Sequence, residues 1–410
     1  MQGYQSKVCF GFYEIHDITG KYQQLYNLLR GQGVPSIGGV LKELVLLTLH
    51  RAIKDLFSVD SFKHLKSYCF GILNTPLKEN SLQNAEPVVP FNFENNLNII
   101  IDEINRLANL TLDKSKIRQH VINEMKKLAM CSGIINKQQD SKTQLKWFQN
   151  ALKDLLIYNN NGSTFFKEIF FIELILSKIV KEWLSEKNQS NNYGLFNNLM
   201  ITKVLLEILG RFGQPANYLT MYVELIKILT SPIIIYHFND QDNLSGSLKN
   251  EFSQTPGTAM ITSKLILNLF DVKYINDYLM VNVYEGVKYF NRERFEDLMN
   301  WLFILCNLSN IKLLESGDIR KSESEFQNDL TVKGSSSSIK QKLKRRTLSI
   351  LKESHRQISK IKSIAEKCGY KLDDFIQELK EKEKALHPSP LFTSEKKSTK
   401  KTAKNKKGNS

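Results

Sequence analysis

Apolar side chains recur every third or fourth residue along most of the chain, a spacing that stacks them on one face of an α-helix. A clear stripe contains Leu41, Leu44, Val45, Leu49, Ala52, Ile53, Leu56 and Phe57. Alternation typical of β-strands is rare, with Val8–Tyr13 and Pro232–Phe238 as the two short candidates. The spacing therefore predicts an all-α fold.

Helix-breaking residues lie between the apolar stripes. No proline lies between Pro90 and Pro215, or between Pro256 and Pro388. Since proline costs about 3 kcal/mol inside a helix, long helices can run through both gaps. Further helices are predicted at Leu97–Leu110, Ile117–Cys131, Leu145–Tyr158, Phe165–Leu184, Ile201–Leu209, Leu219–Leu229, Met260–Phe270 and Leu298–Leu314.

Short polar turns separate these helices, as at residues 210–213, where a helix stop is followed by a restart at Pro215. Helix, turn and helix at irregular spacing are typical of an irregular helical-repeat solenoid of the HEAT/armadillo kind. No motif recurs at a fixed period, so a multi-helix bundle remains the alternative. In either case we expect a basic helical segment and a disordered tail at the C-terminus.

The composition changes along the chain divide it into four parts. We expect an all-helical body at 1–320 with a possible internal boundary near 75–95 and a polar loop at 239–257, an acidic and Ser-rich linker at 321–338, a basic helical segment at 339–384, and a disordered Lys-rich tail at 385–410.

The formal net charge of +15 is concentrated near one end of the chain. Residues 321–410 carry 23 basic and 11 acidic side chains, whereas residues 1–320 carry 34 and 31. The body is therefore nearly neutral, and the last fifth of the chain is the part suited to binding a polyanion.

The basic helical segment also carries an apolar seam. Its members are Ile358, Ile361, Ala365, Cys368, Leu372, Phe375 and Leu379. The seam is too short for an independent coiled coil, so we expect it to dock on the body or on a partner. Gly369 is expected to divide it into two helices.

Two lysine-rich clusters are the candidate site for nucleic acid and for nuclear import. The residues are Lys340, Lys342, Lys344, Arg345, Arg346, Lys396, Lys397, Lys400, Lys401, Lys404, Lys406 and Lys407. Such lysines bind RNA or DNA phosphates without reading bases, and no aromatic residues are interleaved to stack on bases. Ser349, with Arg346 three residues earlier, is a candidate phosphorylation site whose phosphate would cancel part of the charge.

No catalytic, cofactor or metal motif is present in the sequence. Gly33 and Gly38 have Walker-A spacing, but Gly39 and Val40 stand where the motif needs lysine and serine or threonine. The five cysteines and seven histidines are scattered, and no apolar run is long enough to cross a membrane. We therefore expect no cofactor, no enzyme activity and no transmembrane association.

These features favour a nuclear scaffold whose body binds protein partners within a larger complex and whose basic end holds RNA or DNA. Assembly of a ribonucleoprotein such as a pre-ribosome, hence the nucleus and its nucleolus, is the first expectation. A subunit of a chromatin-associated complex is the second. A cytoplasmic protein–protein adaptor in trafficking, without a nucleic-acid role, is the third.

Overall fold

The computed structural model describes residues 14–64, 91–136, 166–187, 192–213, 215–239, 260–310 and 336–386 of the 410-residue chain. This part is mostly helical and contains one short β-hairpin, which confirms the predicted all-α class. Several predictions lie outside these residues: the segments Val8–Tyr13 and Leu145–Tyr158, the loop after Asn239, the linker up to residue 335 and the tail from residue 387.

The N-terminal part contains the helices α1 (Lys21–Leu29), α2 (Ile37–Leu56), α4 (Phe91–Ala108) and α5 (Lys114–Asn136). The Ser36 hydroxyl caps α2 by accepting a hydrogen bond from the backbone N–H of Gly39 at 3.1 Å. Gly38 and Gly39, which follow Gly33 in the Walker-A-like spacing, belong to the first turn of α2. Helix α4 begins at Phe91, inside the region where an internal boundary was predicted.

The central helix is α7 (Phe166–Lys187), in which every residue from 169 to 180 is buried. It is followed by the π-helical turn η1 (Gly194–Asn198) and by α8 (Ile201–Arg211), α9 (Ala216–Leu229) and α10 (Pro232–Asn239). The predicted stop and restart between α8 and α9 are confirmed: Gly213 has a φ of 82°, and Pro215 is the N-cap of α9. Residues 232–238 are helical, which excludes this short strand candidate and agrees with the all-α prediction.

The last third of the described chain contains α12 (Ser263–Phe270), α13 (Ile275–Tyr278) and α14 (Arg292–Asn310). Between α13 and α14 the antiparallel strands β1 (Asn282–Tyr284) and β2 (Val287–Tyr289) form a hairpin. Its two turn residues, Glu285 and Gly286, both have positive φ, the conformation of a type I′ turn that matches the strand twist.

Two helices complete the fold, α16 (Ser336–Lys367) and α17 (Leu372–Leu386). Gly369, with a φ of 60°, separates them, as the sequence predicted. Helix α16 begins within the serine run, ahead of the predicted start at residue 339.

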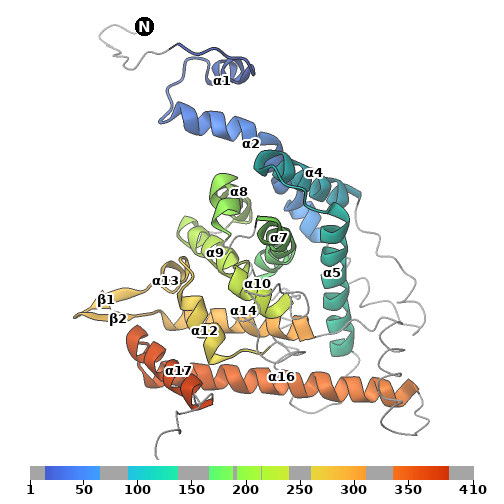
Figure 1. The fold of residues 1–410 in the computed structure, drawn as a ribbon, viewed down its shortest axis with the longest axis vertical. Helices are drawn as coiled ribbons and strands as arrows, with labels where there is room; N and C mark the ends of the chain where they lie inside the picture. Colours follow the sequence, from blue (N-terminus) through green and yellow to red (C-terminus); the bar gives the residue numbers. More distant parts are fainter. Residues whose placement is uncertain are drawn as a thin grey trace, which may run out of the picture.

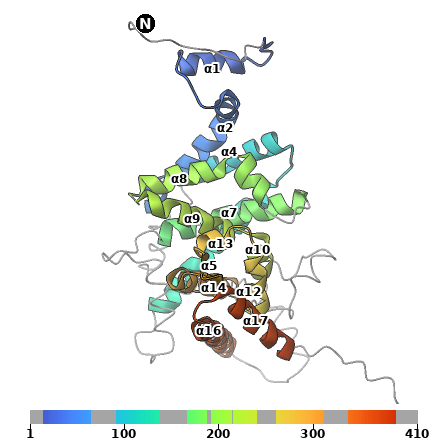
Figure 2. The same ribbon diagram turned by 90° about the vertical axis from the view of Figure 1, so that its left-hand side faces the viewer.

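Helices α1, α2 and α4 lie toward one end of the molecule, α7 to α10 lie in the middle, and α12, α14, α16 and α17 lie toward the other end (Figure 1). The perpendicular view in Figure 2 shows the same order, with α16 and α17 at the end opposite the N-terminus. One hydrophobic cluster of buried residues runs from α2 to α17 and includes most of the predicted seam. The basic helical segment is therefore built into the folded body and is no separate appendage.

Candidate nucleic-acid interface

Helix α16 is fixed to α14 by a buried contact and by a hydrogen bond at the surface. The Ser354 hydroxyl of α16, which is fully buried, lies 3.4 Å from the Cys306 thiol of α14. Nearby, the Lys362 ammonium donates a hydrogen bond to the Asn300 side-chain oxygen at 3.2 Å. Burial raises the pKa of Cys306 to about 11, so this thiol is protonated and serves as a packing group.

Helix α17 completes the attachment through an aromatic cluster. The fully buried ring of Phe375 lies with its centroid 5.4 Å from those of Phe290 and Phe295, and 6.0 Å from that of Phe270. The backbone N–H of Phe290 donates to the carbonyl of Tyr370 at 3.0 Å. Since aromatic pairs of this kind add to the hydrophobic term, the turn between α16 and α17 is held firmly against the hairpin.

The opposite face of α16 carries exposed cations. Lys352, Arg356, Lys360 and Lys367 are all exposed. At about 100° per residue they lie within an arc of about 80°, and Ile358, Ile361 and Ala365 of the buried seam lie on the other side of the helix. We call these four residues the α16 cation row. The row spans about 22 Å at 1.5 Å per residue.

One carboxylate partly balances this row. The Arg356 guanidinium donates to Glu353 at 2.7 Å, and this hydrogen bond lowers the pKa of the Glu353 carboxyl. The positive charge of Lys360 also lowers the pKa of the Glu353 carboxyl. In the described part of the chain no salt bridge joins Lys352, Lys360 or Lys367 to a carboxylate. An exposed ion pair such as Arg356–Glu353 contributes little free energy. The row is thus available to an external anion.

The predicted basic cluster continues this row in sequence. Lys342, Arg345 and Ser349 precede Lys352 at steps of three and four, which also keep to one side of a helix, and the backbone of α16 is helical throughout. Their side chains lie outside the described residues, as do those of Lys340, Lys344 and Arg346. The tail residues Lys396, Lys397, Lys400, Lys401, Lys404, Lys406 and Lys407 also lie outside.

Sequence reasoning missed the cation row itself. It identified lysines that are adjacent in the chain, whereas the row consists of residues that are separated by a helical turn. The signal was present: basic residues at steps of four and seven, in register opposite the apolar seam. Across its whole length α16 holds ten basic and two acidic side chains.

Helix α17 has the opposite character. It holds five acidic and three basic side chains, and Asp373, Asp374 and Glu378 are exposed. The basic surface therefore ends where α16 ends, and α17 is a natural internal control for charge effects.

A second candidate surface lies at the far end of the molecule. Helix α1 and the first half of α2 extend beyond the other described helices (Figures 1 and 2). They expose large apolar side chains, among them Tyr26 at 70%, Leu28 at 59% and Leu47 at 50%. We call this part, residues 14–47, the N-terminal arm. Exposed apolar side chains of this size make the arm a candidate for contact with a protein partner.

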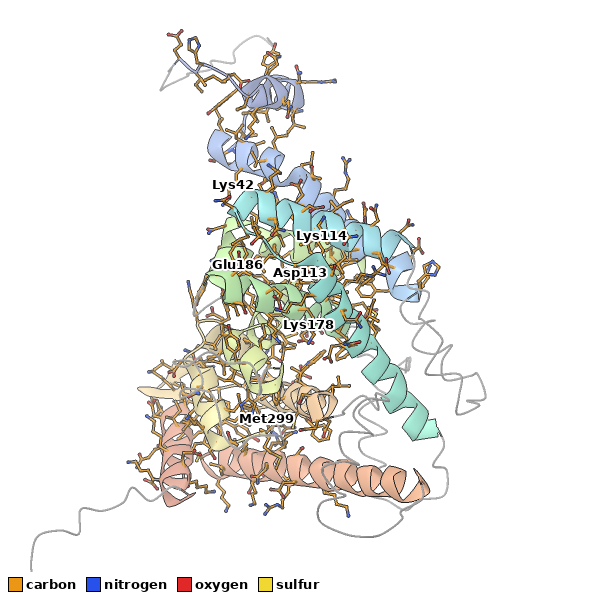
Figure 3. All side chains as sticks on the ribbon, turned by 45° about the vertical axis from the view of Figure 1, so that its right-hand side comes forward. Lys42, Asp113, Lys114, Lys178, Glu186 and Met299 are labelled. Atoms are coloured by element: carbon orange, nitrogen blue, oxygen red, sulfur yellow. The ribbon has the colours of Figure 1, made fainter. Side chains whose placement is uncertain are left out.

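Charged side chains also line the interface between α5 and α7, where Lys178 and Glu186 are labelled in Figure 3. Lys116 of α5 lies 2.8 Å from Glu182, and Lys178 lies 3.7 Å from Glu124 of α5. The Glu173 carboxyl is fully enclosed beside Lys178, and desolvation raises its pKa to about 8. Among the described residues, no group of three or more His, Cys, Asp and Glu side chains could hold a metal ion.

No single helix in the described ranges is long and apolar enough to span a membrane, although the pair α9 and α10, bent by 49°, passes the same test of length and composition. Comparisons of the chain with protein-family models, with curated proteins and with solved structures found no match.

Proposed function

We propose that the protein is a non-enzymatic nuclear scaffold that holds nucleic acid on α16 and the Lys-rich tail and holds protein partners on its body. One observation carries the proposal: α16 is anchored through its apolar seam and offers a cation row on the opposite face. Lysine and arginine along such a row neutralise phosphates, which supplies affinity without base specificity.

The setting that fits these properties best is assembly of a ribonucleoprotein, with a pre-ribosome in the nucleolus as the first case and a chromatin-associated complex as the second. Both contain dense phosphate backbone together with many protein surfaces. The N-terminal arm, at the end opposite α16, supports simultaneous binding of a protein partner and a nucleic acid.

We infer further that the body is an irregular helical-repeat solenoid. Contacts between helices that are close in the chain, α2 with α4, α5 with α7 and α8 with α9, support this architecture, because repeat proteins contact mainly their neighbours. The packing of α12 against α17 is a contact between more distant helices. The exposed apolar arm also favours a second function, a cytoplasmic adaptor that binds proteins only.

Binding of a structured RNA tests the proposed function. A chain that ends near residue 330 would lose the seam of α16 and α17, so point substitutions in the full chain are the better tool. We expect the triple variant Lys352→Gln, Lys360→Gln and Lys367→Gln to weaken RNA binding roughly tenfold or more at low salt. The matched control is Lys380→Gln, Lys382→Gln and Lys384→Gln, which removes the same charge from α17 and should have little effect.

The contribution of the tail is tested in the same assay by a chain that ends at Leu386, the last residue of α17. This chain should bind RNA more weakly than the full chain and should keep the dependence on the α16 cation row. Absence of RNA binding by the full chain would contradict the proposal and favour the adaptor. Import is tested by tagging, since a chain that lacks residues 387–410 and carries glutamine at Lys342, Lys344, Arg345 and Arg346 should stay in the cytoplasm.

A further inference from the structure

The shape of the α16 surface indicates which kind of nucleic acid it can bind. Helix α14 packs against α16, and α17 lies beside its C-terminal end (Figures 1 and 2). The cation row lies on the face of α16 away from the buried seam, at the edge of the molecule. Its exposed surface is therefore a convex ridge. Proteins that bind single strands without sequence preference use a basic groove that follows the backbone, together with aromatic side chains that stack on the bases.

The described part of the ridge has no aromatic side chains on which bases could stack. From residue 352 to 367, the exposed positions of α16 hold cations, Glu366, His355 and the hydroxyls of Ser359 and Ser363, and no aromatic ring. Lysine, arginine and serine all donate hydrogen bonds to phosphate oxygens. The ridge can thus contact phosphates and offers no platform for bases.

The ridge is also straight and anchored at several points. Ser354 contacts Cys306, Lys362 contacts Asn300, and the seam is buried along the same length. A rigid row of cations about 6 Å apart at the four-residue steps matches a partner whose phosphates are themselves held in place. A duplex presents such phosphates, and its major groove in DNA admits an α-helix.

We propose that the α16 cation row binds double-stranded nucleic acid, through phosphate contacts along a groove, in preference to a single strand. This inference rests on the proposed function, because it specifies which polyanion the same surface takes. RNA and DNA duplexes share the phosphate chemistry, so both are expected to bind.

The test uses the full chain and four fluorescent probes of equal length: an RNA duplex, a DNA duplex, and an unpaired single strand of each. Anisotropy titrations over a salt series give the affinity and the slope of log K against log salt. At equal phosphate concentration we expect both duplexes to bind roughly tenfold more tightly than either single strand. The duplex slope should decrease by roughly 0.9 for each lysine of the row that is replaced by glutamine.

The α17 triple variant is the control, since it changes the net charge equally and lies off the row. Equal affinity for duplex and single strand, or an equal effect of the α16 and α17 variants, would overturn the inference while leaving nucleic-acid binding intact. Binding to none of the four probes would instead contradict the proposed function.

Discussion

The Cys306 thiol of α14 and the Ser354 hydroxyl of α16 lie 3.4 Å apart, and both side chains are buried. Since α16 carries most of the cations of the described C-terminal segment, this contact joins the basic surface directly to the core of the body. The basic side chains therefore lie on a folded helix whose orientation is fixed. Substitutions that remove exposed charges can be distinguished from substitutions that unfold the helix.

Helix α16 should contribute strongly to stability. Replacing the buried Ile361 by alanine removes core side-chain volume, which should lower the free energy of unfolding by about 2–5 kcal/mol. Chemical denaturation followed by circular dichroism measures the loss. Ser359→Ala on the exposed face is the control and should change it by less than about 0.5 kcal/mol. An equally small loss for Ile361→Ala would show that α16 is not part of the core in solution.

Gly369 should be required by the turn between α16 and α17. Its φ of 60° lies in the left-handed region and no atom would touch an added Cβ, so Gly369→Ala should cost about 1 kcal/mol through backbone strain alone. Gly210 lies inside α8, where an added Cβ would make only ordinary contact with Leu219 at 3.6 Å. Gly210→Ala should therefore stabilise the protein, by about 0.5–1 kcal/mol, and thermal unfolding of the two variants should show opposite shifts.

Burial of Glu173 should make stability depend on pH. Its pKa of about 8 in the folded state exceeds the ordinary 4.5, since desolvation outweighs the attraction of Lys178, so the folded state holds the proton more tightly. The stability that this proton confers is complete below about pH 4.5 and is lost as the pH rises to 8. Compared with Glu173→Gln, the wild-type protein should become progressively less stable over this range. A difference between the two proteins that does not vary with pH would contradict the assignment.

The N-terminal arm should bind a protein partner without supporting the fold. Tyr26→Ser combined with Leu28→Ser alters two exposed side chains and should leave the unfolding temperature nearly unchanged. Quantitative co-purification from nuclear extract should show loss of specific partners from this variant, whereas the exposed polar control Asn27→Ser should retain them. An unchanged set of partners would mean that the arm is not the protein-binding surface.

Helices and their ends were predictable where apolar periodicity, glycine or proline determines the local backbone conformation. The apolar stripe of α2, the break between α8 and α9 at Gly213 and Pro215, and the division at Gly369 follow from periodicity and from residues that only certain backbone conformations accept. The hairpin was not predicted although Tyr284 and Val287 flank a Glu-Gly turn, because each strand has only three residues and the surrounding pattern is helical.

Contacts between distant segments were not predictable from the chain. Lys116 and Glu182 form an ion pair across 66 residues, and the seam of α16 could equally have met another protein. The candidate site was found only in part, since a search for adjacent lysines detects residues 340–346 but overlooks the row from Lys352 to Lys367. That row becomes visible once the buried face of α16 is known.

Photo-crosslinking tests the central claim most directly. A photoreactive amino acid placed at Ser363 lies on the exposed face of α16 within the cation row, and the same amino acid at the exposed Gln377 lies on the acidic α17. With labelled structured RNA and the full chain, we predict a crosslink from position 363 that added salt abolishes, and little or none from position 377. Equal crosslinking from both positions, or crosslinking from position 377 alone, would contradict the assignment of α16 as the nucleic-acid surface.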